Sequence, residues 1–351
     1  MGYETDLKLF IDGVWKSGEG SDGHTVLTPV NASPIAEVPY ATKADLDEAL
    51  EASNRAWPEW RSMDVEKRGA ILHKGVAQLV HGDADLISRT LIASRVVRKV
   101  SFTGSTGVGK HLMRLCADSM TRVTMELGGH APVLIFDDCD LEKTLDMVVP
   151  QKFRNAGQVC VSPTRFYVQS GIYDAFIKGF AERTAKVTIG NGLEADTKMG
   201  PLANSRRPDA IDALVQDAKA KGARVLAGGE RGDSGFFFQP TLLADVPNEA
   251  EIMNEEPFGP VAVSRPFETF EEVIEQANRL PYGLAAFAFT ENGRRANLIG
   301  DLIESGMVGI NTFALSVADA PFGGVKDSGF GSEGGKEGLE SYQVVKAIHQ
   351  A

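Results

Sequence analysis

The sequence predicts an α/β fold, and three observations support this prediction. Between residues 81 and 303, strand-like apolar runs alternate with helix-like runs, a pattern typical of doubly wound sheets. The chain has 351 residues, which is long enough for a sizeable core and for two domains. Hydrophobic residues make up 43% and charged residues 24% of the chain, as is usual for globular proteins.

The N-terminal part is expected to contain extended segments followed by helices. Residues 7–15 alternate in polarity around Asp12-Gly13, a dipeptide that favours a tight hairpin turn. Residues 25–39 contain three prolines and are expected to be extended. Thr42 is a good N-cap for a helix with an apolar stripe. A second helix is expected over 65–80, because its apolar residues recur at helical spacing.

The rest of the chain continues the alternation of strands and helices. Strands are expected at 99–103, 123–127, 132–136, 223–227, 284–290 and 342–348, and helices at 86–93, 110–119, 140–149, 171–187, 208–221, 269–278 and 293–303. We expect 99–103 to be a buried strand that leads through a glycine-rich turn into the next helix.

The composition argues against several classes of protein. The net charge of −12 disfavours a surface for nucleic acid or acidic membranes. No apolar run reaches about 18 residues, so no transmembrane helix is expected. The N-terminus lacks the basic and apolar regions of a signal peptide, and Asp6 stands where a myristoylation signal needs Ser or Thr.

Cysteine and histidine usage favours a reducing compartment and no metal centre. The three cysteines show no CxxC spacing, which favours free thiols and a cytoplasmic location. Cys116 and Cys139 are interpreted as structural or incidental cysteines. None of the six histidines pairs with another at metal-ligand spacing, so no metal site is expected.

The turn at 104–109 follows a strand and begins a helix, an arrangement whose backbone N–H groups can bind phosphate. It satisfies G-x-x-x-x-G-K, but His111 stands where the P-loop needs Ser or Thr for Mg²⁺. It also fails the dinucleotide pattern G-x-G-x-x-G, because Leu112 replaces the last glycine. A plain strand-to-helix turn is the alternative.

One acid and one cysteine stand out as candidate catalytic residues. Glu126 precedes the pair Gly128-Gly129, and Cys160 follows downstream. A cysteine thiolate is a strong nucleophile near neutral pH, and a carboxylate can activate the water that clears a covalent intermediate. Spacing alone does not establish this pair.

Five ordered segments carry a resemblance to a known family. They are Glu-Leu-Gly-Gly at 126–129, Phe-Arg-Asn-Ala-Gly-Gln-Val-Cys at 153–160, and the stretches 102–106, 255–261 and 321–326. Together they resemble the motifs of the aldehyde dehydrogenase superfamily, most closely those of NAD(P)-dependent succinate-semialdehyde dehydrogenases. The resemblance covers nearly the whole chain and leaves one large gap.

The resemblance implies a reaction and a cofactor site. Cys160 would attack an aldehyde to give a thiohemiacetal, hydride would leave to NAD or NADP, and water activated by Glu126 would hydrolyse the thioester. The residues that match the family's cofactor-binding positions are Gly104, Ser105, Gly109, Glu256 and Phe258. Glu256 would accept from the hydroxyls of the nicotinamide ribose, and Phe258 would lie beside the nicotinamide.

The substrate is suggested by two further positions. Arg154 and Ser316 match residues that bind the far carboxylate of the substrate in succinate-semialdehyde dehydrogenases. A planar guanidinium suits a carboxylate, so the resemblance implies a semialdehyde acid of unspecified length. A structural or surface arginine is the alternative interpretation of Arg154.

The gap lies near residues 75–81, where the family has about 130 more residues. By resemblance, this block carries the asparagine that donates to the oxyanion, the lysine and glutamate that bind the adenosine ribose, a hairpin used in assembly and the first strands of the cofactor sheet. Strand 99–103 would then lie at a sheet edge. The alternative function is therefore an inert remnant of such an enzyme.

The expected organisation combines a truncated Rossmann-type cofactor domain with an α/β catalytic domain. The N-terminal arm and the incomplete dinucleotide-binding domain would span 1–128, and the catalytic cysteine domain 129–330. The tail at 331–351 would add a strand to a neighbouring subunit of a homo-oligomer. The expected partners are a small aldehyde and further copies of the chain, with no nucleic acid and no membrane.

Overall fold

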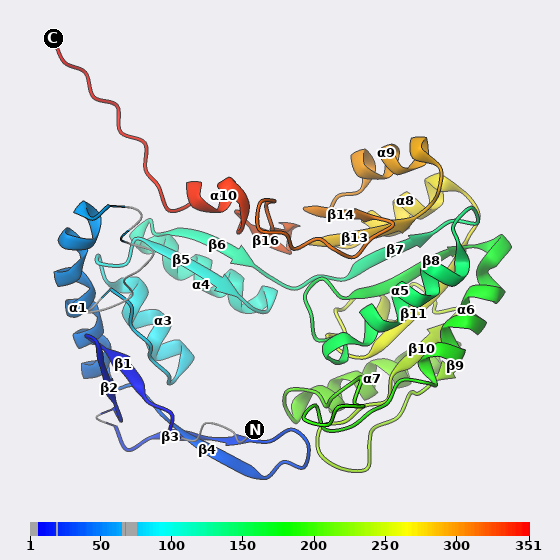
Figure 1. Cartoon of the computed structure of the whole chain (residues 1–351), viewed down its shortest axis with the longest axis horizontal. Coiled ribbons are helices and arrows are strands. Elements are labelled where there is room, and N and C mark those ends of the chain that lie inside the picture. The colour runs from blue at the N-terminus through cyan, green and yellow to red at the C-terminus, as the bar shows by residue number, and fades with distance from the viewer. Residues whose placement is uncertain (1–5, 19, 65–66, 68–75) are drawn as a thin grey trace. The chain divides into compact units, whose positions relative to one another are not determined.

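The computed structural model describes residues 6–18, 20–64, 67 and 76–351 (Figure 1). The chain forms two compact units. One unit comprises residues 1–28, 32–100 and 110–123, and the other comprises 29–31, 101–109 and 124–351. The mixture of helices with a mainly parallel sheet confirms the α/β fold class. The domain limits expected at 128 and 330 stay predictions.

The first unit begins with two hairpins. β1 (Leu9–Ile11) pairs with β2 (Val14–Lys16), and β3 (Gly23–Leu27) pairs with β4 (Pro34–Pro39), both antiparallel. Asp12 and Gly13 have φ angles of 52° and 81°, the left-handed values that a tight two-residue hairpin turn requires. The hairpin predicted at 7–15 is confirmed.

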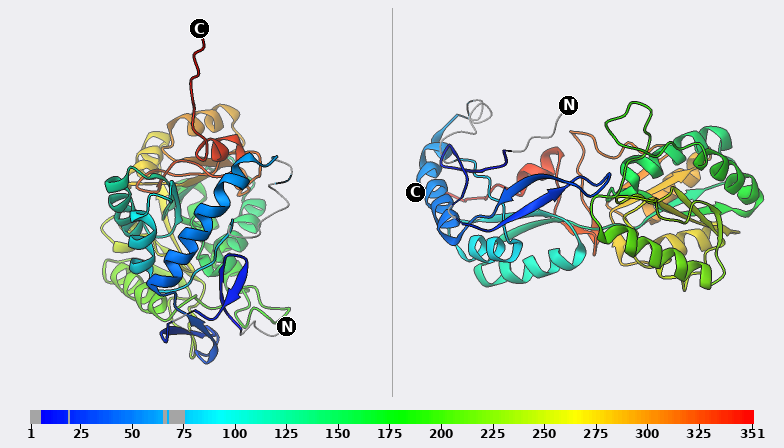
Figure 2. Two further views of the ribbon diagram at one scale, coloured as in Figure 1. Left: turned by 90° about the vertical axis from the view of Figure 1, so that its left-hand side faces the viewer. Right: turned by 90° about the horizontal axis from the view of Figure 1, so that it is seen from below.

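Two helices complete the first unit. α1 (Lys43–Ser62) starts at a capping box in which Thr42 and Asp45 bind each other's backbone N–H groups, as predicted for Thr42. α3 (Ala84–Ala93) is capped by the Asp83 side chain, and it packs beside α1 (Figures 1 and 2).

The helix predicted over 65–80 falls partly outside the described residues. Its described C-terminal end, residues 76–80, is not helical. Leu79 instead exchanges two backbone hydrogen bonds with Phe10 of β1, at 2.9 and 2.8 Å. The expectation of a helix is wrong for these five residues, because pairing with β1 satisfies backbone groups that a helix would satisfy internally.

The second unit is built on a seven-stranded sheet with the order β14-β13-β7-β8-β11-β10-β9. Its strands are β7 (Ala131–Ile135), β8 (Pro163–Gln169), β9 (Arg224–Ala227), β10 (Thr241–Ala244), β11 (Val261–Phe267), β13 (Ala285–Phe289) and β14 (Met307–Ile310). Neighbouring strands are parallel except for β9 and β10. Every residue of β7 is buried, as expected for a parallel strand covered on both faces.

The second unit also contains helices and short strands. They are α5 (Leu141–Phe153), α6 (Ser170–Thr184), α7 (Arg206–Ala220), α8 (Phe270–Asn278), α9 (Gly293–Leu302), α10 (Gly335–Glu340), the short 3-10 helices η1 (Arg154–Gly157) and η2 (Glu251–Met253), and the paired strands β12 (Tyr282–Gly283) and β15 (Val325–Lys326). α5 and α6 pack side by side (Figure 1). The core joins both helices to β7, β8 and β11 through fully buried aromatic and aliphatic residues.

A separate three-stranded sheet has the order β16-β6-β5. It contains β5 (Lys99–Thr103), β6 (Arg122–Glu126) and β16 (Gly329–Phe330), and α4 (Thr106–Ser119) follows β5. β5 ends this order, and Ser101 and Thr103 are exposed. The prediction that 99–103 is buried is therefore wrong, because only one described strand lies beside it.

The C-terminal tail forms no strand within the single chain. Residues 343–351 follow α10 without regular structure (Figure 1), and the side chains of Val344, Val345 and Ile348 are exposed. The strand expected at 342–348 is absent because a strand needs a partner, and the pairing with a neighbouring subunit stays a prediction.

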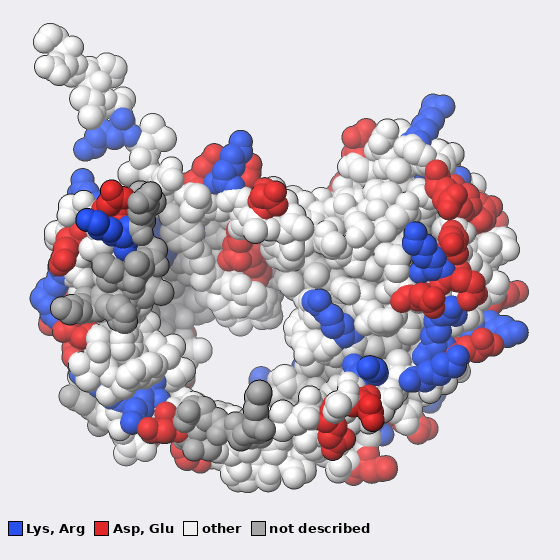
Figure 3. Space-filling model, viewed as in Figure 1, with Lys and Arg blue, Asp and Glu red and all other residues white. Residues whose placement is uncertain are grey.

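The surface bears both signs of charge. On the face shown in Figure 3, acidic and basic side chains are interspersed over the described residues rather than separated into patches. No helix in the described part of the chain is long and apolar enough to cross a membrane.

Candidate functional site

Glu126 ends β6, next to β16. Its side chain is only 4% exposed, and both carboxyl oxygens are buried without a hydrogen-bond partner among the described residues. Burial raises the pKa of Glu126 to about 7, and the negative charge of Glu333 adds to this rise. A carboxyl group that titrates near neutral pH suits a general base.

The pair Gly128-Gly129 brings two other candidates close to this strand. A Cβ atom on Gly128 would lie 2.5 Å from Glu256 Oε2, and one on Gly129 would lie 2.8 Å from the carbonyl oxygen of Cys160. The Gly129 N–H donates to Glu256 Oε1 at 3.2 Å. Side chains at these two positions would push the neighbours away, so the glycines permit this close approach.

Cys160 is a half-buried free cysteine. Burial raises the pKa of its thiol, and the carboxylates of Glu256 and Glu126 raise it further. Both carboxylates therefore lie close enough to the sulfur to act on its charge, and the shared catalytic role of the three residues stays a prediction. A raised pKa also means that the thiol needs a base to become a nucleophile.

A left-handed turn precedes Cys160. Asn155, Ala156 and Gly157 have φ angles of 50°, 52° and 68°. Asn155 Nδ2 donates to the Gln158 carbonyl at 3.0 Å, and the Ala203 N–H donates to Gln158 Oε1 at 2.9 Å. Consecutive residues in the left-handed region of backbone conformation cost free energy. The two side-chain hydrogen bonds stabilise this turn, which precedes the cysteine.

Replacing Gly157 by alanine is expected to lower the free energy of unfolding by about 2–4 kcal/mol. Its φ angle favours glycine, and an added Cβ atom would overlap the carbonyl oxygen of Gly259. Urea denaturation would measure the loss. Gly171→Ala in α6 is the control, because nothing lies within 4 Å of that Cβ position, and it should be neutral or slightly stabilising. Equal stability of both variants would contradict the expectation.

The segment of Glu256 and Phe258 lies against the glycine pair. Burial raises the pKa of Glu256 to about 7, while the Gly129 N–H, Arg207 and Lys152 oppose this rise. Phe258 has a φ angle of 37°, an uncommon value for a residue with a side chain. This strained loop therefore presents a half-buried carboxyl group and an aromatic ring close together in the chain.

Lys152 was not anticipated from the sequence. Its side chain is fully buried, and Nζ donates to Ser162 Oγ at 3.3 Å. Burial lowers the pKa of Lys152 to about 7, and the charge of Glu256 opposes this change. The signal was available, because Leu145, Val148 and Lys152 share helical spacing and the first two are apolar.

The predicted glycine turn lies beside the end of β6. The Gly104 N–H donates to the Glu126 carbonyl at 3.0 Å. A Cβ atom on Gly104 would overlap the Phe102 ring, and one on Gly109 would overlap the Leu127 side chain. Packing thus accounts for both glycines. Ser105 is exposed before the first turn of α4, and a phosphate-binding role for this turn stays a prediction.

The two predicted substrate residues are both exposed. Arg154 stands at the start of the left-handed turn, and Ser316 lies in an irregular segment after β14. No hydrogen bond recorded among the described residues joins them. Their shared role in binding a carboxylate stays a prediction.

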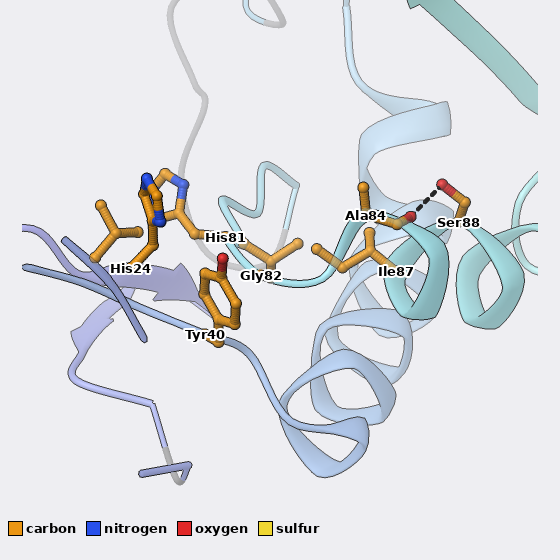
Figure 4. A pocket seen from close by; sticks show the side chains of 9 residues that line it. His24, Tyr40, His81, Gly82, Ala84, Ile87 and Ser88 are labelled. Atoms are coloured by element: carbon orange, nitrogen blue, oxygen red, sulfur yellow. Dashed lines mark hydrogen bonds between the residues drawn. The ribbon is translucent and has the colours of Figure 1, made fainter. Parts of the chain in front are cut away.

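A cavity of about 470 Å³ lies within the first unit. In Figure 4, His24, His81 and Tyr40 gather at one end, and Ala84 and Ser88 of α3 lie at the other. None of the predicted site residues lines this cavity. It therefore adds nothing to the candidate site.

Comparison with known proteins identifies similar sequences and structures. The profile described as "Aldehyde dehydrogenase family" matches residues 15–74 and 72–348. A putative 4-(hydroxymethyl)benzenesulfonate dehydrogenase TsaD2 of Comamonas testosteroni is 48% identical over 278 residues, which are 79% of this chain and 58% of that protein. The NADP-dependent succinate-semialdehyde dehydrogenase GabD of Escherichia coli is 45% identical over 78% of this chain and 57% of its own length.

Solved structures agree with the sequence relatives. A betaine aldehyde dehydrogenase from Staphylococcus aureus, solved with NAD+, superposes with a TM-score of 0.92 at 27% identity. The match covers 97% of this chain and 94% of that one. By sequence, however, the chain spans only 58% and 57% of the two curated relatives.

Proposed function

The chain belongs to the aldehyde dehydrogenase family, and on that premise we propose that its site oxidises an anionic aldehyde, such as succinate semialdehyde, to the carboxylic acid with NAD or NADP. One observation carries this proposal. The Glu256 side chain and the Cys160 backbone lie against Gly128-Gly129, which directly follow the strand that Glu126 ends, and burial raises the pKa of both carboxyl groups to about 7.

The reaction begins and ends at Cys160. Attack of its sulfur on the aldehyde carbon forms the C–S bond of a thiohemiacetal, and the proton of the thiol passes to the aldehyde oxygen. When bound, NAD or NADP would supply the acceptor for the hydride, and loss of the hydroxyl proton to solvent would leave a thioester on Cys160. Glu126 takes a proton from the attacking water, the C–S bond breaks, and the carboxylic acid and the thiol are released.

The residues present fit part of a dinucleotide site. The Glu256 carboxylate can accept from two hydroxyl groups, and one of its oxygens already accepts from the Gly129 N–H. Gly104, Ser105 and Gly109 precede or begin α4. The N–H groups of Gly104 and Gly109 already donate to the Glu126 and Ser105 carbonyls, so a phosphate at this helix start would be bound by other backbone N–H groups of the turn. Phe258 supplies an aromatic face. These assignments, and the choice between NAD and NADP, are part of the proposal.

The names of the relatives support an anionic substrate. One name contains a benzenesulfonate and the other a succinate semialdehyde. Both of these compounds carry an anionic group away from the reacting carbon. An arginine can bind either kind of anion with paired hydrogen bonds. We assign this contact to Arg154, with Ser316 as its partner.

Replacing Arg154 by methionine is expected to lower kcat/KM for succinate semialdehyde by about 10–100-fold, because a charge-assisted hydrogen bond contributes about 1.5–3 kcal/mol. Butanal has the same chain length without the carboxylate, and its kcat/KM should change by less than about twofold. The absorbance of the reduced cofactor measures both. Equal losses for the two aldehydes would show that Arg154 supports the turn rather than the substrate.

An inert remnant is the alternative, and the division of the family match into two pieces favours it. The family match falls into two pieces that meet at residues 72–74, which supports a deletion near 75–81. Loss of one oxyanion donor costs about 10²–10³ in rate. In a remnant, millimolar NAD or NADP would leave the thermal midpoint unchanged.

The proposal also includes a cytoplasmic location, which the free cysteines suggest, and homo-oligomerisation.

A further inference from the structure

Residues near both ends of α7 contact the loop that contains Glu256. Near its C-terminus, Lys221 Nζ donates to the Glu249 carbonyl at 2.9 Å. One turn earlier, Asp217 Oδ2 accepts from the Glu251 N–H at 2.7 Å. These bonds fix the start of the segment that leads to Glu256.

The N-terminal end of α7 holds the other side of this loop. Arg207 Nη2 donates to the Pro257 carbonyl, directly between Glu256 and the strained Phe258. Ile211, one turn later, packs where a Cβ atom on Gly259 would lie. The helix therefore contacts the loop on both sides of the carboxyl group.

The environment of Arg207 links it to Glu256. Its Nε is buried without a hydrogen-bond partner among the described residues. Burial lowers the pKa of Arg207, and the negative charge of Glu256 opposes this change. A half-buried guanidinium with an unsatisfied donor is costly, and the Pro257 carbonyl and the nearby carboxylate are what offset that cost here.

We propose that Arg207 is a positioning residue for Glu256, fixing its loop through the Pro257 carbonyl and favouring its carboxylate form through charge. The effect of Arg207 on cofactor binding rests on the proposed function. Its effect on Glu256 is independent of that function, because it concerns only the position and the protonation of one carboxyl group.

Other groups also act on Glu256, and they set the background for any titration. Lys152 approaches from α5 and favours the carboxylate, while the Gly129 N–H donates to it. Cys160 and Tyr282 are influenced by Glu256 in turn, because its negative charge raises the pKa of both. Arg207 is the cation of α7 that acts on Glu256, so its removal leaves Lys152 as the remaining cation among these groups.

The charge of Arg207 should set the pH at which cofactor affinity falls. A carboxylate accepts from the ribose hydroxyls, and protonation removes part of that capacity. Cofactor affinity should therefore fall as the pH drops through the pKa of Glu256. Without the positive charge that pKa rises, so the fall in affinity moves to higher pH.

The experiment compares three substitutions in otherwise intact protein. Arg207→Gln keeps a donor for the Pro257 carbonyl and removes the charge, Arg207→Lys keeps the charge, and Arg206→Met changes the exposed neighbouring arginine as a control. ¹³C-labelled glutamate reports the titration of Glu256, which is assigned by its loss in Glu256→Gln. Arg207→Gln should raise this pKa by about one pH unit or more, while the other two variants should stay close to wild type.

Equal titrations in wild type and Arg207→Gln would overturn the proposal, as would an equal shift in Arg206→Met. Fluorescence titration with NADP and NAD from pH 6 to 9 is the second measurement. The midpoint of the affinity change should follow the pKa of Glu256 in each variant. If wild-type protein binds neither cofactor, the proposed function fails, whereas the glutamate titration still decides the role of Arg207.

Discussion

Replacing Cys160 by alanine is expected to abolish the oxidation of succinate semialdehyde, with a loss of at least about 10³-fold in kcat. The reaction needs a sulfur that bonds to the aldehyde carbon and later leaves from the thioester. Alanine offers no such atom. The rate would be followed by the absorbance of reduced cofactor, with NAD and with NADP.

The other two cysteines provide the matched controls for this result. Cys116 is buried in α4, and Cys139 is half-buried in the turn after β7. Cys116→Ser and Cys139→Ala should keep the turnover of the wild type within about twofold. Turnover that survives in Cys160→Ala would refute the covalent mechanism. A folded wild-type protein that oxidises none of several aldehydes would leave the remnant interpretation.

Local elements of the fold could be predicted because their causes are local. Thr42 and Asp45 form a capping box from residues three apart, and Asp12-Gly13 forms its turn from two adjacent residues. Such signals are contained in a few consecutive residues. The same reasoning gave the helix after β5, but α4 begins at Thr106, so residues 106–109 of the turn predicted at 104–109 are helical.

Burial could not be predicted where it depends on neighbours elsewhere in the chain. Residues 99–103 have the pattern of a buried strand, yet β5 ends its sheet and is half-exposed, which agrees with the edge position expected from the gap. Residues 76–80 continue a helical pattern, yet pairing with Phe10 keeps Leu79 extended. For Leu79 a tertiary contact overrides the local preference, and for β5 the position at the end of the described sheet does.

The candidate site shows the same division. Motifs predicted Glu126, Cys160 and Glu256 as candidate site residues, because the chemistry of each depends on one residue type in a recognisable sequence. Arg207 and Lys152 were not predicted, because the residues that they contact are brought near them only by folding. The Pro257 carbonyl is 50 residues from Arg207 in the chain, and no local pattern marks such a pair.

Replacing Glu126 by glutamine is expected to slow hydrolysis of the thioester by about 10²–10⁴-fold, because glutamine cannot accept the proton of the attacking water. The first turnover should persist as a burst of reduced cofactor, followed by a slow steady state. In the wild type, the hydrolytic rate should rise with pH through about 7, where Glu126 ionises. This pH dependence should disappear in Glu126→Gln.

Stability distinguishes the loss of a base from damage to the fold. The pKa of Glu126 is raised from 4.5 to about 7 in the folded protein, so the folded state holds a proton that the unfolded state has lost between these values. Folding is thus disfavoured by Glu126 as the pH rises through that window. Glutamine removes this penalty, and urea denaturation at pH 8 should find the variant at least as stable as the wild type.

A second substitution tests the cause of the raised pKa. The negative charge of Glu333 contributes to it, so Glu333→Gln should move the pH dependence of hydrolysis to lower pH without abolishing it. If Glu126→Gln instead keeps both the wild-type steady state and its pH dependence, another group is the base. The buried and unpartnered carboxyl group at the end of β6 would then need a different explanation.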